Sequence, residues 1–126
     1  MTRVVVWGTG NVGRPAIRAV AAHRDLELAG VIVANPDKVG VDAGELANID
    51  PLGVAATDDV ELACSSDVDA VVYTVNSDFR PVESQAEVET MLRAGTNVVT
   101  PSFYPLYHPP STPPALAEPI RAACRE

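Results

Sequence analysis

The chain opens on the stretch VVVWGTGNVG at residues 4–13, in which a run of apolar residues meets three spaced glycines. The β-branched run predicts a strand that is buried on both faces, as strands of parallel sheets are. Beyond the glycines, apolar residues recur at helical spacing at Ala16, Ile17, Val20 and Ala21. The sequence therefore begins with a strand, a tight turn and a helix.

The G-x-G-x-x-G spacing in this context predicts a dinucleotide-binding turn. Gly8 permits the tight turn, Gly10 lets the backbone approach a pyrophosphate, and Gly13 lets the helix pack closely on the strand. Backbone N–H groups and the positive end of the helix dipole would then face the phosphates. A glycine-rich turn that binds no ligand is the alternative interpretation.

Length, composition and charge limit the class of protein. The 126 residues fit one domain, and 47% hydrophobic with 21% charged residues is typical of a soluble globular protein. A net charge of −8 argues against nucleic acid or an anionic membrane as a partner. No apolar stretch approaches the roughly 20 residues that span a bilayer, and no secretory signal precedes the first strand. We therefore expect a cytoplasmic location.

The cysteines and histidines do not suggest metal or nucleophilic chemistry. Cys64 and Cys124 are far apart, so we expect two small, partly buried apolar side chains. His23 and His108 form no metal-ligand spacing with each other or with a cysteine. No metal site is expected, and no catalytic residue can be assigned.

Apolar runs alternate with helical patterns, which predicts an α/β fold with a parallel sheet. Strands are expected at residues 3–7, 28–34, 54–57, 70–75 and 97–100. Helices are expected at residues 12–23, 43–47, 58–64, 81–94 and 115–125, with Asp58 or Asp59 capping the third and Gly95 ending the fourth. Right-handed crossovers give a Rossmann-type doubly wound sheet of about five strands in the order 3-2-1-4-5.

A ligand crevice is expected where the strand order reverses, between the first and fourth strands. Besides the glycine turn, the strand ends there carry the candidate cofactor-binding residues Thr74, Val75, Asn76, Thr100 and Ser102. Seven of the eleven prolines follow between Pro101 and Pro119, interleaved with three aromatic residues. We interpret this segment as an ordered loop that packs on the sheet or on a partner domain.

The end of the second expected strand bears on the choice of cofactor. An NAD site usually has an acidic residue about 20 positions beyond the glycines, and no carboxylate occupies residues 33–35. Asn35 can form hydrogen bonds, and Lys38 and Arg14 can reach a 2′-phosphate as cations. NADP is therefore favoured over NAD. Two alternatives remain. If the register of the second strand is shifted, Asp37 could bind the ribose as in an NAD site, or Lys38 could be a solvated turn residue without a role in binding.

Three segments resemble the amino-terminal domain of dihydrodipicolinate reductase-like enzymes. They are VVVWGTGNVGR at residues 4–14, VGVDAGEL at residues 39–46 and DAVVYT at residues 69–74. The wider group includes amino-acid dehydrogenases of the 2,4-diaminopentanoate dehydrogenase kind. Residues 10–13 read GNVG where dihydrodipicolinate reductases typically have G-R-M-G, which favours the amine dehydrogenase side. The candidate residues of the turn are Gly8, Thr9, Gly10, Asn11, Val12, Gly13 and Arg14.

The resemblance implies an NAD(P)H-binding Rossmann domain of an oxidoreductase that transfers a hydride to or from a small imine or amino acid. It implies that Thr74, Asn76 and residues 100–103 lie near the nicotinamide. It also implies a second domain for substrate and oligomerisation, which the 126 residues lack. We therefore expect a fragment or one half of a split enzyme, inactive alone, whose partners are the dinucleotide and either a second copy or a separate catalytic domain. The alternatives are a nucleotide-binding or sensing module without catalysis, and an interaction domain that has lost its ligand.

Overall fold

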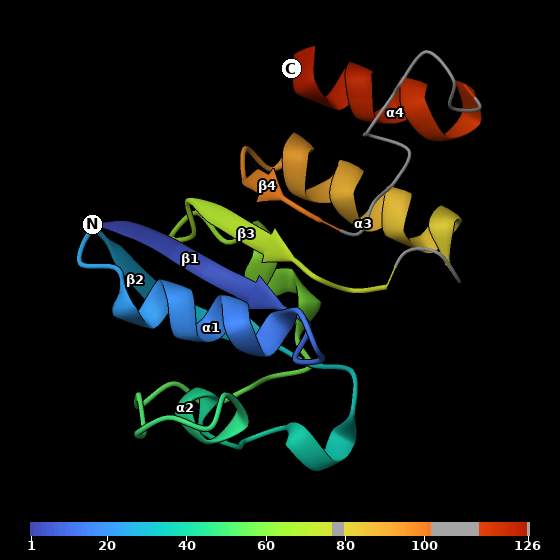
Figure 1. The fold of residues 1–126 in the computed structure, drawn as a ribbon. Helices are drawn as coiled ribbons and strands as arrows, with labels where there is room; N and C mark the ends of the chain where they lie inside the picture. The colour runs from blue at the N-terminus through green and yellow to red at the C-terminus, as the bar shows by residue number, and fades with distance from the viewer. Residues whose placement is uncertain (77–79, 102–113, 126) are drawn as a thin grey trace.

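The computed structural model describes residues 1–76, 80–101 and 114–125 (Figure 1). A parallel sheet has the order β2-β1-β3-β4 and is formed by β1 (Thr2–Trp7), β2 (Leu26–Ile32), β3 (Ala70–Tyr73) and β4 (Asn97–Val99). The α-helices are α1 (Gly13–Ala22), α2 (Ala43–Leu46), α3 (Pro81–Arg93) and α4 (Pro114–Arg125). Short 3₁₀ helices are η1 (Pro36–Lys38) and η2 (Val60–Cys64).

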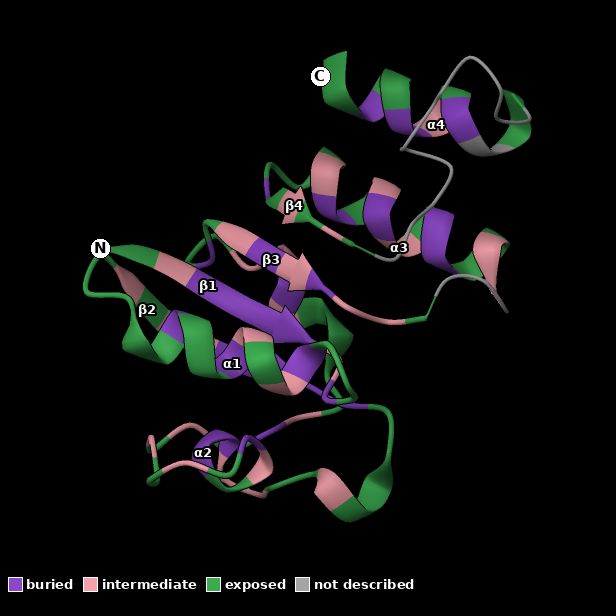
Figure 2. Cartoon of the chain, viewed as in Figure 1, coloured by how far each residue is buried: buried purple, intermediate pink, exposed green. Residues whose placement is uncertain are grey.

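Helices cover both faces of the sheet, which explains why β1 is apolar at successive positions (Figure 2). Val6 belongs to one buried cluster with Ile17 of α1, whereas Val5 belongs to another with Met91 of α3. Adjacent strand residues point to opposite faces, so each face needs its own apolar set. The expectation of a doubly wound α/β fold is confirmed.

The prediction of a regular strand at residues 54–57 is wrong. Thr57 forms one isolated parallel bridge with Ile32, and Ala55 forms an antiparallel bridge with Asp42. The segment pairs on its other side with the loop that precedes α2, since the N–H of Gly40 donates to the carbonyl of Ala56. The segment lies beside β2 as expected, but its pairing is divided between two partners. The described residues therefore form four regular strands, where about five were predicted.

The remaining elements begin and end within two residues of their predicted limits. Asp59, not Asp58, caps η2 by accepting a hydrogen bond from the N–H of Glu61 (3.0 Å). Gly95 follows α3 with φ +88°, which confirms it as the residue that ends the helix. Cys64 is half-buried as expected, whereas Cys124 is exposed on α4. No described helix is long and apolar enough to cross a membrane.

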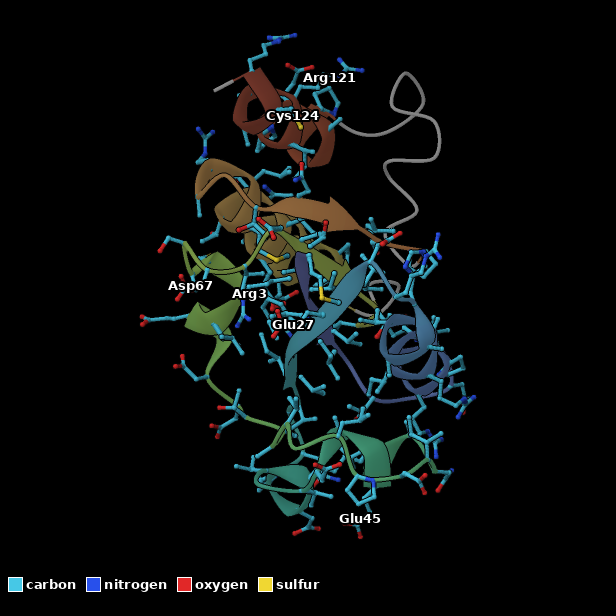
Figure 3. All side chains as sticks on the ribbon, turned by 90° about the vertical axis from the view of Figure 1, so that its left-hand side faces the viewer. Arg3, Glu27, Glu45, Asp67, Arg121 and Cys124 are labelled. Atoms are coloured by element: carbon cyan, nitrogen blue, oxygen red, sulfur yellow. The ribbon has the colours of Figure 1, made fainter. Side chains whose placement is uncertain are left out.

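Polar contacts join the strands at the amino-terminal end of the sheet (Figure 3). The guanidinium of Arg3 pairs with Glu27 of β2 (3.0 Å) and donates to the carbonyl of Asp67 (3.0 Å). The backbone N–H of Arg3 donates to the carboxylate of Asp69 (2.8 Å). In a parallel sheet these residues lie opposite the carboxyl ends of the strands, where the glycine turn is found.

Asp42 organises the long connection between β2 and η2. Its carboxylate accepts hydrogen bonds from the backbone N–H groups of Gly44 (2.7 Å), Leu52 (2.9 Å) and Gly53 (2.8 Å). These bonds, led by that of Leu52, hold the pKa of Asp42 below the ordinary value of 3.8 and outweigh the opposing effect of desolvation. The ionised side chain therefore ties both ends of residues 42–53 together.

We expect Asp42 to contribute to the pH dependence of stability. A carboxyl whose pKa is lowered by folding stabilises the protein above its unfolded pKa, and this contribution is lost as the pH falls through the folded pKa. Asp42→Asn should therefore be less stable than the wild type near neutral pH and should lose less stability below pH 3.8. Urea unfolding across this range measures the difference. Asp50→Asn, at an exposed position in the same loop, is the control, and equal slopes for all three proteins would contradict the assignment.

Candidate dinucleotide-binding site

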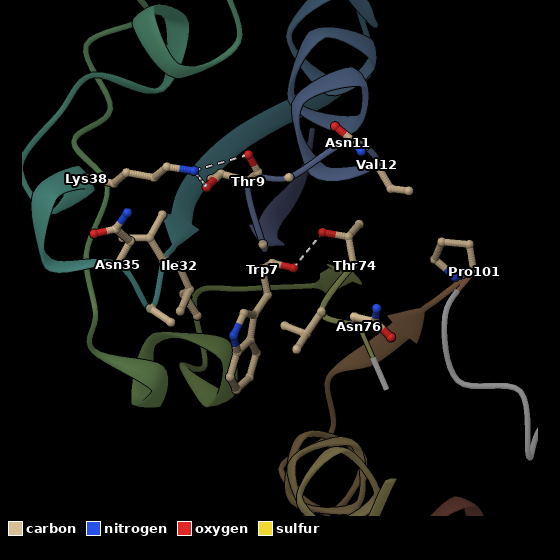
Figure 4. A pocket seen from close by; sticks show the side chains of 15 residues that line it. Trp7, Thr9, Asn11, Val12, Ile32, Asn35, Lys38, Thr74, Asn76 and Pro101 are labelled. Carbon is tan, nitrogen blue, oxygen red and sulfur yellow. Dashed lines mark hydrogen bonds between the residues drawn. The ribbon is translucent and has the colours of Figure 1, made fainter. Parts of the chain in front are cut away.

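A crevice of about 780 Å³ lies at the carboxyl ends of β1, β2 and β3 (Figure 4). Its position beyond the central strands is where doubly wound sheets bind ligands. The lining residues are Trp7, Gly8, Thr9, Gly10, Asn11, Val12, Ile32, Val33, Ala34, Asn35, Lys38, Thr74, Val75, Asn76 and Pro101. The structure thus brings the glycine turn, the end of β2 and the end of β3 together around one space.

Most of the sequence-predicted site residues line this crevice. The exceptions among the described residues are Gly13, Arg14 and Thr100, while Ser102 lies outside the described part of the chain. The crevice is also lined by Trp7 and Ile32, the last residues of β1 and β2, which were not predicted as site residues. Their position at strand ends is the signal that would have identified them.

Gly8 shapes the bottom of the crevice. It has φ +111°, in the region that favours glycine, and its N–H donates to the carbonyl of Ile32 (2.9 Å). A Cβ at this position would overlap the hydroxyl of Thr74. That hydroxyl donates to the carbonyl of Trp7 (2.8 Å), so the end of β3 is packed directly against the start of the turn.

The other two glycines of the motif have opposite surroundings. A Cβ at Gly13 would overlap the carbonyl oxygen of Gly8, so α1 can begin this close to β1 only with glycine there. A Cβ at Gly10 would meet no atom within 4 Å, because this residue faces the open crevice. Gly13 is therefore required by the fold, whereas the protein itself gives no steric reason for glycine at position 10.

The turn leaves backbone donors available. The N–H groups of residues 9–12 donate no hydrogen bond to the described residues, and no side chain caps α1. Arg14, in the first turn of α1, donates from Nε to the carbonyl of Gly10 (3.4 Å). Free N–H groups at a helix start form an anion-binding arrangement, which suits a pyrophosphate.

The end of β2 supplies a cation and no carboxylate to the crevice. Lys38, the only lysine in the sequence, donates from Nζ to the hydroxyl of Thr9 (3.0 Å) and lies 3.5 Å from its carbonyl oxygen. Asn35 accepts a hydrogen bond from the backbone N–H of Asp37 (3.0 Å). Asp37 is exposed and is absent from the lining, and no acidic residue is among the described lining residues. The side chain of Lys38 therefore bridges η1 to the turn and is not simply solvated.

A polar cluster lies behind the crevice wall. Trp7 and Tyr73 pack edge to face, with ring centroids 5.2 Å apart. The Tyr73 hydroxyl contacts Ser84 (3.2 Å), Glu87 (3.0 Å) and Arg80 (3.3 Å). Burial is the main cause that raises the pKa of Tyr73 to about 12, so its hydroxyl stays protonated at physiological pH. No described group of His, Cys, Asp and Glu side chains is arranged to hold a metal ion.

Comparison with known proteins defines the family. A family model described as the amino-terminal part of dihydrodipicolinate reductase matches residues 2–101. The chain belongs to this family. Its fold is accordingly that of the NAD(P)-binding domain of dihydrodipicolinate reductase-like and amine dehydrogenase-like oxidoreductases, which confirms the resemblance seen in the sequence.

The relatives include both amine dehydrogenases and 4-hydroxy-tetrahydrodipicolinate reductases. An amine dehydrogenase of Streptomyces virginiae is 52% identical over 127 residues, covering 100% of this chain and 35% of that protein. A 4-hydroxy-tetrahydrodipicolinate reductase of an Anaeromyxobacter species is 39% identical over 80% of this chain and 38% of that protein. The solved amine dehydrogenase of Mycobacterium smegmatis superposes with a TM-score of 0.81 at 29% identity, over 97% of this chain and 36% of that one. The chain thus spans about a third of the length of these relatives.

We expect the two glycine positions to respond differently to the same substitution. Gly13→Ala places a methyl group against the carbonyl of Gly8, so stability should fall by about 1–3 kcal/mol, the range of overpacked sites. Gly10→Ala has room for its methyl group and should stay within about 0.5 kcal/mol of the wild type. Urea unfolding of the two variants is the measurement. Equal losses would show that the close approach at Gly13 does not constrain the fold.

Proposed function

We propose that the crevice binds NADP and that the chain is the cofactor-binding domain of an oxidoreductase acting on a small amine or imine. The single observation that carries this proposal is the open turn at Gly10, flanked by unpaired N–H groups and by Lys38. These donors and this cation complement the negative charges of NADP, which carries a 2′-phosphate in addition to its pyrophosphate. The similarity to amine dehydrogenases over the whole chain favours an enzyme over a module that only binds nucleotides.

Each part of the crevice fits one part of the cofactor. The N–H groups of residues 9–12 would bind the pyrophosphate. Lys38 and the Thr9 hydroxyl, joined at 3.0 Å, would bind the 2′-phosphate together with Asn35. Arg14 would add positive charge on the side of the crevice where the 2′-phosphate is proposed to bind. Thr74, Val75, Asn76 and Thr100, at the ends of β3 and β4, would border the nicotinamide.

The cofactor supplies the hydride chemistry of the reaction, and the described residues supply its position. Binding orients the dinucleotide along the strand ends, and orientation is a large part of the rate that such enzymes achieve. Substrate binding and proton transfer belong, in this proposal, to a second domain, because the chain spans about a third of its relatives. The oligomeric state and the cytoplasmic location stay predictions.

Gly10→Val is expected to remove most of the dinucleotide affinity. The branched side chain would extend into the space proposed for the pyrophosphate, and its Cβ would meet no other atom of the protein within 4 Å. We expect a loss of at least about tenfold, or about 1.4 kcal/mol. Calorimetry with NADP+ measures it, with Ala19→Val on the exposed side of α1 as the control. Equal affinities of the wild type and Gly10→Val for NADP+, with both proteins folded, would contradict the proposal.

Lys38 is expected to determine the choice between NADP and NAD. One charge-assisted hydrogen bond contributes about 1.5–3 kcal/mol, so the preference for NADP should be about tenfold or more. Lys38→Glu should abolish or invert this preference, whereas Asp37→Ala should leave it unchanged. Because the chain has one lysine, NADP+ should also protect the ε-amine selectively from acylation, measured by mass spectrometry. Tighter NAD binding by the wild type that depends on Asp37 would reverse the assignment.

A further inference from the structure

A groove of about 600 Å³ lies between η2 and α3. It shares only Trp7 with the lining of the dinucleotide crevice, and the indole of this residue extends away from Thr9 and Lys38 (Figure 4). No residue of the glycine turn lines the groove. The groove is therefore a separate space from the one proposed for the cofactor.

The bottom of the groove is apolar. It is formed by Trp7 and by Met91 of α3, which belong to the same buried cluster. Val60 of η2 and Ala86 of α3 also line the groove, and both are exposed. A concave space of this volume with apolar walls is typical of small-molecule sites. The groove can therefore take the apolar body of a ligand.

The polar oxygen atoms of the lining are available as hydrogen-bond acceptors. The Glu61 carboxylate makes no hydrogen bond or ion pair with the described residues. Glu87 pairs through Oε1 with Arg80 (2.6 Å), and its Oε2 has no partner among the described residues. The Thr90 hydroxyl donates to the carbonyl of Ala86 (2.8 Å), which leaves the hydroxyl oxygen free to accept.

The electrostatics of the groove favour a cation. Neither lysine nor arginine is among its described lining residues. Burial, and after it the negative charge of Glu61, raises the pKa of the Cys64 thiol, so the field of this carboxylate reaches the groove. The net charge of −8 adds to the attraction for cations. A complementary ligand therefore has a positive charge and hydrogen-bond donors on an apolar body.

We propose that the groove between η2 and α3 binds a small organic cation, an ammonium group on an alkyl or aryl chain. The ammonium group would contact Glu61 and Glu87, and the chain would cover Trp7 and Met91. An ammonium donates three hydrogen bonds and accepts none, which suits a lining of acceptors. The site needs no dinucleotide, so this proposal goes beyond the proposed function and does not depend on it.

The first test uses the two cysteines of the unaltered chain. Cys64 lines the groove, whereas Cys124 is exposed on α4 and is the internal control. We expect phenylbutylammonium to slow the alkylation of Cys64 by N-ethylmaleimide and to leave the rate at Cys124 unchanged, measured by peptide mass spectrometry. Phenylbutanol, which lacks the charge, should give half-protection only at a concentration at least about threefold higher, the effect of an exposed ion pair. Phenylbutanoate should protect least.

The second test uses variants that separate the charge from the space. Glu61→Gln should reduce the preference for the ammonium over the alcohol at least about twofold. Glu83→Gln, at an exposed position of α3 outside the groove, should keep this preference. Ala86→Leu puts a larger side chain into the groove from an exposed helical position and should weaken both probes. Circular dichroism checks that each variant is folded.

The outcomes distinguish this proposal from the proposed function. Equal protection of Cys64 by the ammonium and the alcohol, or a preference that survives Glu61→Gln unchanged, would overturn the cation site. Protection that grows with protein concentration in the absence of a probe would also overturn it, because a second copy would then cover the groove. None of these results bears on NADP binding. Failure of the wild type to bind a dinucleotide would contradict the proposed function and leave the cation site standing.

Discussion

The close approach of Gly13 to the carbonyl of Gly8 is the contact on which the rest of the structure depends. No side chain fits between them, so the start of α1 packs directly against the residue that follows β1. This start directs Ile17 and Val20 onto one face of the sheet. It also leaves the N–H groups of residues 9–12, which line the crevice, without partners among the described residues. One steric requirement therefore fixes the helix, the core beneath it and the glycine turn together.

Patterns within a single element were sufficient to predict most of the fold. The apolar run of β1 predicts a strand that is buried on both faces, and the structure has a buried cluster on each face. The helical pattern at residues 81–94, followed by Gly95, predicted α3 and its end. These signals depend on neighbours in the sequence, and the physics that they encode is local. They also located the glycine turn, whose geometry follows from three residues within six positions.

Contacts between distant residues could not be predicted in the same way. The bond from Thr74 to Trp7 spans 67 positions, and the bond from Lys38 to Thr9 spans 29. The sequence showed that Lys38 was a possible phosphate ligand but not that it reaches the turn. Residues 54–57 form a short, mostly apolar run of the kind that predicts a strand, yet their second neighbour is an irregular loop. The competition between β2 and this loop for the backbone of residues 54–57 is a tertiary effect, which strand propensities cannot predict.

The charge of the molecule shows why the crevice has to work through short-range groups. The protein carries a net charge of −8, so its overall field opposes an anionic dinucleotide. Screening limits that field to about 8 Å at physiological ionic strength, whereas direct hydrogen bonds act at about 3 Å. The lining therefore needs no excess of cations, only donors at the correct positions and no carboxylate close to a phosphate. The N–H groups of the turn and the single lysine meet the first condition, and the exclusion of Asp37 from the lining meets the second. The carboxylates of Asp58 and Glu87 lie in an adjoining recess and are not among the described lining residues of the crevice.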